Sequence, residues 1–105
     1  MATSPGEVFM IDLGMAGKVR PGVVLSREDD DPPRDLILVG PLTTEFRESR
    51  YEIPIGKPKF LREPSWLNLQ GLQSMRPSVL LRQIGRIDTA TMERIKDGLR
   101  FAFDL

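Results

Sequence analysis

The stretch LILVGPLTTEFRESRYEIPI, residues 36–55, decides the fold class of this chain. Its first part, Leu36 to Gly40, is a short and uninterrupted apolar run, which is typical of a buried strand. Its last part, YEIPI, alternates apolar and other residues with the period of two that a half-buried strand shows, and Pro54 indicates a sheet edge or a bulge. The polar connection between the two parts carries paired threonines and two arginines. The stretch therefore predicts two strands of a mainly β fold.

Further strands are expected on both sides of this stretch. EVFMIDL, Glu7 to Leu13, is apolar on both alternating faces, as in a strand that is covered on both sides. GVVLS, residues 22–26, is expected to form a strand of which Pro21 is the first residue, because proline cannot donate to a central ladder. WLNLQGL, from Trp66, alternates again, and VLLRQIGRI, residues 79–87, is a further extended run. QSMRPS, between the last two, is expected to break the chain.

The chain is expected to end in a helix over residues 88–103. Asp88 is a suitable N-cap residue, and apolar side chains follow it at helical spacing. These side chains are Met92, Ile95, Leu99 and Ala102. Several short strands followed by one amphipathic helix predict a small, strongly bent sheet or barrel with a helix packed on it. We expect one domain over residues 1–105, with residues 1–5 as a loose leader.

Composition excludes several classes of function. The 105 residues contain neither cysteine nor histidine, which removes thiolate metal sites, the commonest metal ligand and the commonest general base. Fifteen basic and fifteen acidic residues give no net charge, so a nucleic-acid site would have to be local. The acidic run Glu28 to Asp31 is expected to lie in a solvated loop and not to bind metal. With no long apolar run and no signal-peptide pattern, we expect a cytoplasmic protein without a membrane segment.

Arg20 is the first candidate for chemistry, because it stands directly before Pro21 and an apolar strand. One interpretation is a solvated strand end, or an ion pair with an acid such as Asp12. The other is phosphate binding, since guanidinium is a rigid fork of donors that stays charged at any useful pH.

The other candidates lie on two polar stretches. Thr43 and Thr44 follow a buried strand. At the end of that strand they either shape a turn or present a hydroxyl to a substrate. Asn68 and Gln70 either face water or read base edges. Trp66 lies on the same face of the predicted strand, where it either packs as a core or interface residue or stacks on a base.

Several short motifs together resemble the MazF/PemK toxins of bacterial toxin–antitoxin systems. They are Gly6-Glu7, Arg20-Pro21 and the run Pro41-Leu42-Thr43-Thr44 ahead of YEIPI. Their order, their spacing and the terminal helix extend the resemblance over nearly the whole chain, from about Gly6 onward. The resemblance implies a small SH3-like β-barrel of the CcdB/PemK/MazF type with a C-terminal helix, which forms a homodimer and is blocked by an antitoxin protein.

The resemblance also implies an activity and the residues that carry it. The family consists typically of sequence-specific, metal-independent endoribonucleases that cut single-stranded RNA by attack of the ribose 2′-OH, which leaves a 2′,3′-cyclic phosphate and a 5′-hydroxyl. Arg20 and Thr43 fall on the catalytic arginine and threonine, and no cofactor is expected. We expect RNA to contact Lys18, Thr44, Arg47, Arg50, Trp66, Asn68, Gln70 and Gln73.

Two departures from the family pattern leave an alternative open. The connection before Arg20 is shorter than in many relatives, and Asn68 and Gln70 stand where some relatives carry an arginine and an aspartate that transfer protons. The alternative is a member of the fold that acts by protein binding, as CcdB-type proteins poison DNA gyrase through the end of the C-terminal helix. Here that end carries Phe101 and Phe103, and we expect Phe103 to pack on the barrel.

Overall fold

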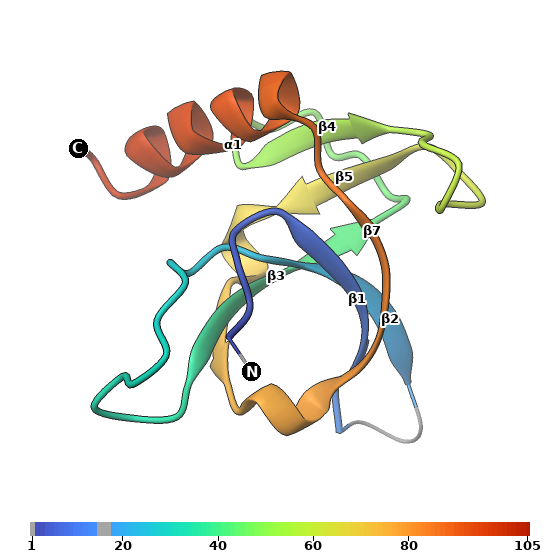
Figure 1. Ribbon diagram of the computed structural model, residues 1–105. Coiled ribbons are helices and arrows are strands. Elements are labelled where there is room, and N and C mark those ends of the chain that lie inside the picture. The colour runs from blue at the N-terminus through green and yellow to red at the C-terminus, as the bar shows by residue number, and fades with distance from the viewer. Residues whose placement is uncertain (1, 15–17) are drawn as a thin grey trace.

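The computed structural model describes residues 2–14 and 18–105, which form one antiparallel sheet and one helix (Figure 1). The strands are β1 (Glu7–Asp12), β2 (Val19–Val24), β3 (Ile37–Thr43), β4 (Glu52–Gly56), β5 (Ser65–Asn68), β6 (Gln73–Met75) and β7 (Leu80–Arg86). Two 3₁₀ turns, η1 (Leu69–Gly71) and η2 (Pro77–Val79), flank β6, and α1 (Thr89–Ala102) ends the chain. The predicted mainly β fold with a C-terminal helix is confirmed.

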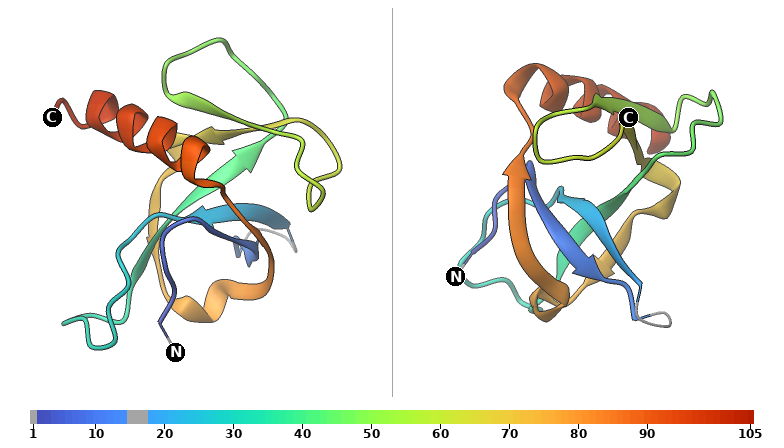
Figure 2. Two further views of the ribbon diagram at one scale, coloured as in Figure 1. Left: turned by 45° about the horizontal axis from the view of Figure 1, so that its top comes forward. Right: turned by 90° about the vertical axis from the view of Figure 1, so that its right-hand side faces the viewer.

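The sheet is strongly curled but it is not closed into a barrel. Its strand order is β4-β5-β3-β2-β1-β7, and β6 pairs with β3 beside β5. In the part of the chain that the structure describes, β4 and β7 each have one strand neighbour, so the two ends of the sheet do not pair with each other. Figures 1 and 2 show β1, β2, β3 and β7 wrapping around the lower half of the molecule, while α1 lies across the other half beside β4.

Two groups of buried side chains lie on opposite faces of the curled sheet. The larger group joins strands to the helix and includes Val23, Leu67 and Ile95. The smaller group, Ile11, Val24 and Val39, lies on the other face of β1, β2 and β3. Because adjacent residues such as Val23 and Val24 point to opposite faces, both faces of β2 are apolar. The same arrangement explains the doubly apolar pattern that the sequence shows in β1.

The helix α1 is fixed at its start by a side-chain cap and along its length by packing. The Asp88 carboxylate accepts a hydrogen bond of 2.7 Å from the backbone N–H of Thr91, which is one of the donors that a helix start leaves without an intrahelical partner. Ile95 is fully buried, and the other members of the predicted stripe pack around it on the larger core group. These members are Met92, Leu99 and Ala102.

Three predicted elements differ in detail from the structure. Strand β2 begins at Val19 and not at Pro21, which is tolerated because pairing with β3 starts only at Gly22 and Pro21 has one strand neighbour. The alternating run from Trp66 leaves the strand conformation after Asn68 and turns into η1. The stretch QSMRPS contains the short strand β6, which a three-residue pairing with β3 creates and which no local pattern predicts.

Phe103, near the C-terminal end of the chain, also differs from expectation. Phe103 is 57% exposed and does not pack on the sheet, because the helix ends at Ala102 and Asp104 turns the chain with a φ of 57°. At the other end, Ser4, inside the expected loose leader, donates its backbone N–H to Glu7 and accepts from Arg86. Half of the glycine-containing connection before Arg20, residues 14–19, falls on residues 15–17, outside the described residues. No helix among the described residues is long and apolar enough to span a membrane.

The cap at Asp88 gives a prediction for stability against pH. The hydrogen bond from the Thr91 backbone N–H lowers the pKa of Asp88 from its ordinary value of 3.8. A carboxyl whose pKa is lower in the folded state stabilises the fold above that ordinary value, and the stabilisation is lost as pH falls through the folded-state pKa. We therefore expect Asp88→Ala to lower the thermal unfolding midpoint at pH 7 and to do so much less at pH 2–3.

Asp88→Asn is the matched control for this experiment, because asparagine is an equally good N-cap residue without the titration. We expect Asp88→Asn to stay near the wild-type midpoint at pH 7. A destabilisation by Asp88→Ala that is the same at pH 7 and at pH 2–3 would contradict the account of the cap.

Candidate nucleic-acid interface

Arg20 lies inside β2 with its guanidinium available to an external anion. It is exposed, and its cross-strand partner on β1 is the buried Ile11. The ion pair with Asp12 that the sequence allows does not form, because strand alternation places Asp12 on the opposite face from Ile11 and Arg20. Asp12 instead accepts the backbone N–H of Gly14 at 2.9 Å. Among the described residues, no carboxylate forms an ion pair with Arg20.

Arg20 borders a small hollow that we call the Arg20 hollow, of about 130 Å³. Its lining is mostly apolar, and part of that lining belongs to the smaller core group or packs against it. Gln73 is the second long polar side chain on the lining. The full lining is Ile11, Leu13, Arg20, Pro21, Gly22, Val39, Pro41, Gly71, Gln73 and Met75. Gln73 pairs across strands with Val39, so it faces the same side of the sheet as Arg20.

Thr43 is the last residue of β3 and lies two residues beyond the point where β3 stops pairing with β2. The pairing ends at Gly22 opposite Pro41. Since alternate residues of a strand share a face, Arg20 lies on the face of Gly22 and Thr43 on the face of Pro41, which is the same face of the sheet. The Thr43 hydroxyl oxygen accepts the backbone N–H of Glu45 at 3.0 Å. This bond fixes the oxygen and leaves the hydroxyl proton able to be donated to a ligand.

Thr43 borders a second hollow of about 330 Å³, which we call the Thr43 hollow. All of its lining side chains are polar: Thr43, Glu45, Arg47, Ser49, Glu52, Asn68 and Gln70. Three of the predicted RNA contacts, at positions 47, 68 and 70, therefore lie around the same space as Thr43. The arrangement offers both donors and acceptors to a polar ligand.

The two hollows are neighbours, because consecutive residues of η1 line them. Gln70 lines the Thr43 hollow, and the next residue, Gly71, lines the Arg20 hollow. Gly71 packs closely on Pro41, since a Cβ atom at Gly71 would lie 2.7 Å from the proline Cγ. The Asn68 side chain begins this turn by accepting the Gln70 backbone N–H at 3.0 Å. Gln70 therefore lies in the turn η1, whereas the sequence predicts it on the polar face of a strand.

Glu52 organises the loop that forms one wall of the Thr43 hollow. Its carboxylate accepts hydrogen bonds from the backbone N–H of Arg47 at 3.0 Å and from the backbone N–H and the hydroxyl of Ser49 at 3.2 Å each. Arg47 also lies 3.4 Å from the Glu45 carboxylate, in an exposed ion pair. The β3–β4 loop is therefore held at its start by Thr43 and at its end by Glu52.

An aromatic pair stands beside Thr43. Trp66 on β5 is the direct cross-strand partner of Thr43, so the indole lies on the same face. The ring of Phe46, from the anchored loop, stacks on it with centroids 4.8 Å apart and planes 6° apart. One face of the indole that was expected to stack a base is therefore covered by Phe46. Phe46 is absent from the predicted contacts, because no spacing in the sequence indicates that a loop phenylalanine reaches a strand tryptophan.

The remaining predicted contacts are spread around the site. Lys18 is exposed before β2, and its carbonyl accepts the Leu13 backbone N–H at 3.2 Å. Thr44 is exposed directly after Thr43. Arg50 lies elsewhere, with its guanidinium carbon 3.9 Å from the ring centroid of Phe101 on α1. Arg50 therefore contacts the helix and does not line either hollow.

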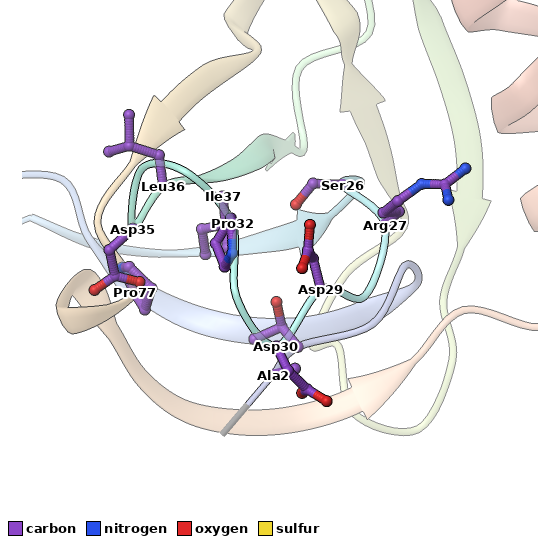
Figure 3. Close-up of a pocket in the computed structure, with 11 residues that line it drawn as sticks. Ala2, Ser26, Arg27, Asp29, Asp30, Pro32, Asp35, Leu36, Ile37 and Pro77 are labelled. Atoms are coloured by element: carbon purple, nitrogen blue, oxygen red, sulfur yellow. The ribbon is translucent and has the colours of Figure 1, made fainter.

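A third hollow, of about 290 Å³, lies under the acidic β2–β3 loop and is shown in Figure 3. Asp29, Asp30 and Asp35 line it, with Arg27 as the one cationic side chain on its wall. Its negative charge disfavours phosphate, and none of the predicted site residues borders it. No group of three or more side chains able to hold a metal ion is found among the described residues.

The hydrogen bonds to Glu52 predict a specific contribution to stability. We expect Glu52→Ala to lower the free energy of unfolding by about 1 kcal/mol, because the Arg47 and Ser49 donors lose an ionised acceptor. Urea unfolding measures this change. Glu63→Ala, at an exposed loop glutamate, is the matched control and should change stability by less than about 0.5 kcal/mol. Equal unfolding midpoints for the two variants would contradict the role of Glu52.

Comparison with known proteins agrees with this geometry over nearly the whole chain. A relative named "Probable endoribonuclease MazF5", from Mycobacterium tuberculosis, is 34% identical over 101 residues, which cover 94% of this chain and 91% of the relative. "Endoribonuclease MazF3", from the same species, is 30% identical over 95 residues, covering 90% and 92%. The solved structure of "Mycobacterium tuberculosis toxin MazF-mt6" superposes with a TM-score of 0.83 at 28% identity, over 94% of this chain and 97% of that one.

The family match covers the strands, both hollows and the helix. Residues 4–103 match the family described as PemK-like, MazF-like toxin of type II toxin–antitoxin system. The matched range contains Arg20, Thr43 and all the residues that line the Arg20 and Thr43 hollows. This chain belongs to the PemK-like, MazF-like family of toxins.

Proposed function

We propose that this chain is the toxin of a toxin–antitoxin pair and acts as a sequence-specific, metal-independent endoribonuclease on single-stranded RNA. The observation that carries the proposal is that Arg20 and Thr43 lie on one face of β2 and β3, Arg20 at the border of an apolar hollow and Thr43 at the border of a polar one. Relatives whose names state an endoribonuclease support it. Those names favour this activity over the gyrase-binding alternative.

In the proposed reaction, the 2′-oxygen of a ribose attacks the adjacent phosphorus. A bond forms between the 2′-oxygen and phosphorus, and the bond between phosphorus and the 5′-oxygen breaks. The 2′-oxygen loses a proton and the 5′-oxygen gains one, so the products are a 2′,3′-cyclic phosphate and a 5′-hydroxyl. The reaction consumes no oxidant and no water, and it needs no metal ion to balance.

Arg20 and Thr43 are proposed to act on the phosphate in this reaction. Negative charge gathers on the non-bridging oxygens in the transition state, and a fixed guanidinium stabilises it. Arg20 suits this role because it is exposed and has no carboxylate partner among the described residues. The Thr43 hydroxyl, whose oxygen is fixed by Glu45, would donate a hydrogen bond to the same phosphate.

The substrate class follows from the size and polarity of the hollows. Each is small, and the side chains of Asn68, Gln70 and Gln73 offer amide donors and acceptors around them. Amides can pair with base edges only when those edges are exposed, as they are in single-stranded RNA. Asn68 and Gln70 do not titrate, so in this chain they are assigned to binding and not to proton transfer.

The proposal includes partners and a location. We infer that an antitoxin protein blocks the chain, as the family description implies, and that two copies associate as a homodimer. Exposed apolar side chains on the sheet, such as Leu38 and Leu81, offer surface for such contacts. Because messenger RNA is the proposed substrate, we propose a cytoplasmic location.

The direct test is cleavage of a long single-stranded RNA by purified protein in the presence of EDTA. We expect wild-type protein to cut at defined sites and Arg20→Ala to lower kcat about 10²- to 10³-fold, the usual cost of one transition-state donor. Thr43→Val keeps the side-chain shape without the hydroxyl and should lower kcat about 10- to 100-fold.

Arg34→Ala is the matched control, because Arg34 is an exposed arginine in the acidic β2–β3 loop and borders neither proposed hollow. It should cleave as wild type does. Intact RNA after prolonged incubation with excess wild-type protein would refute the proposed activity, and full activity of Arg20→Ala would refute the role of Arg20.

A further inference from the structure

We propose that Phe46, supported from behind by Trp66, is a stacking platform for the base of a nucleotide next to the scissile phosphate. This inference rests on the proposed function and assigns a base-binding residue to it. Four observations carry it: the geometry of the aromatic pair, the exposure of Phe46, the position of the pair beside Thr43, and the anchoring of the loop that carries Phe46.

The aromatic pair is arranged as a stack and not as an ordinary core contact. The two rings are nearly parallel, 6° apart, with a centroid distance of 4.8 Å. Aromatic pairs in proteins are found both offset-stacked and edge to face. In a parallel stack, the outer face of the outer ring points away from the inner ring, and a ligand ring can continue the stack there. One face of Phe46 is covered by the indole, yet 47% of the residue is exposed. A flat apolar ring surface is therefore open to solvent.

The platform is rigid on its inner side and anchored on its outer side. Trp66 is paired on both edges of β5, with Thr43 on β3 and with Pro54 on β4. Phe46 lies between two anchors of its own loop, the Thr43 hydroxyl that accepts from Glu45 and the Glu52 carboxylate that accepts from Arg47. Because the ring is already positioned before RNA arrives, little conformational freedom is lost when a base stacks on it.

The place of the platform connects it to the reaction. Directly opposite residues of neighbouring antiparallel strands have Cβ atoms about 4.5–5.5 Å apart, so the Trp66 side chain stands next to that of Thr43. The residues on both sides of Phe46, Glu45 and Arg47, line the Thr43 hollow. A phosphate held by Thr43 and Arg20 thus has one of its neighbouring bases within reach of the Phe46 ring.

The chemistry of the platform defines what it binds. A phenyl ring has no hydrogen-bond donor or acceptor, so it accepts the face of any base and holds it by stacking. The amides of Asn68 and Gln70, on the wall of the same hollow, can then read the edge of a base. Phe46 is therefore expected to supply affinity and position, and the amides to supply sequence preference.

The test compares Phe46→Leu with Phe46→Tyr in the RNA cleavage assay. Leucine keeps an apolar contact with the indole but has no π face, whereas tyrosine keeps the face. We expect Phe46→Leu to raise KM about 5- to 100-fold, as the loss of one base–aromatic stack does, with kcat changed less than threefold. Phe46→Tyr should restore the wild-type KM. Phe103→Ala, at an exposed phenylalanine beyond the helix, is the matched control and should leave KM unchanged.

A binding measurement without cleavage separates this inference from the proposed activity. Trp66 is the single tryptophan of the chain, so its fluorescence reports on the platform alone. Titration with a single-stranded DNA oligonucleotide, which lacks the 2′-OH and is not cut, should change the emission of wild type and of Phe46→Tyr, and much less that of Phe46→Leu. Cleavage by wild type with equal KM for Phe46→Leu, or unchanged Trp66 emission at saturating oligonucleotide, would overturn the platform while leaving the activity intact.

Discussion

The pairing of strand β3 with three other strands is the constraint on which both hollows depend. One edge of β3 pairs with β2 in a register that places Thr43 and Arg20 on the same face of the sheet. The other edge pairs first with β6 and then with β5, and η1 lies between these two pairings. These pairings place Gln73 opposite Val39 and Trp66 opposite Thr43, on the same face of the sheet. A slip of β3 by one residue would turn Thr43, Pro41 and Val39 to the opposite face and would separate Thr43 from Arg20.

The polar contacts around Thr43 fix the position of the loop that carries candidate RNA-binding residues. The Thr43 oxygen and the Glu52 carboxylate hold the two ends of the β3–β4 loop, which carries Arg47 toward the Thr43 hollow and Phe46 onto Trp66. Arg20 differs from these residues because its guanidinium has no carboxylate partner among those described. A charged donor without a partner in a folded protein is able to bind an anion at little cost, since no internal contact must first be broken.

Much of the fold could be predicted from the sequence, because apolar periodicity reports burial directly. The strand that contains Ile11, the buried run before Thr43 and the capped helix after Asp88 all have clear patterns. Strand β6 could not be predicted, because its pairing with β3 is a tertiary contact with no local signal. Resemblance to a family was needed to select Arg20 and Thr43, since a lone arginine before a proline has a common structural explanation. The charge of Arg50 predicts an RNA contact, but packing directs its guanidinium to Phe101. No local pattern indicates Phe46, because its contact with Trp66 is a tertiary contact.

The most direct test of the central claim examines the ends of the RNA fragments that the purified protein makes. We propose that Arg20 and Thr43 stabilise attack of a ribose 2′-OH on the neighbouring phosphate. Mass spectrometry of fragments from an RNA with one cleavage site, made in EDTA, should find a 2′,3′-cyclic phosphate on one fragment and a 5′-hydroxyl on the other. A substrate with a single 2′-deoxyribose at that site should stay intact. Cleavage of the deoxy-substituted substrate, or fragments with a 5′-phosphate, would contradict the account.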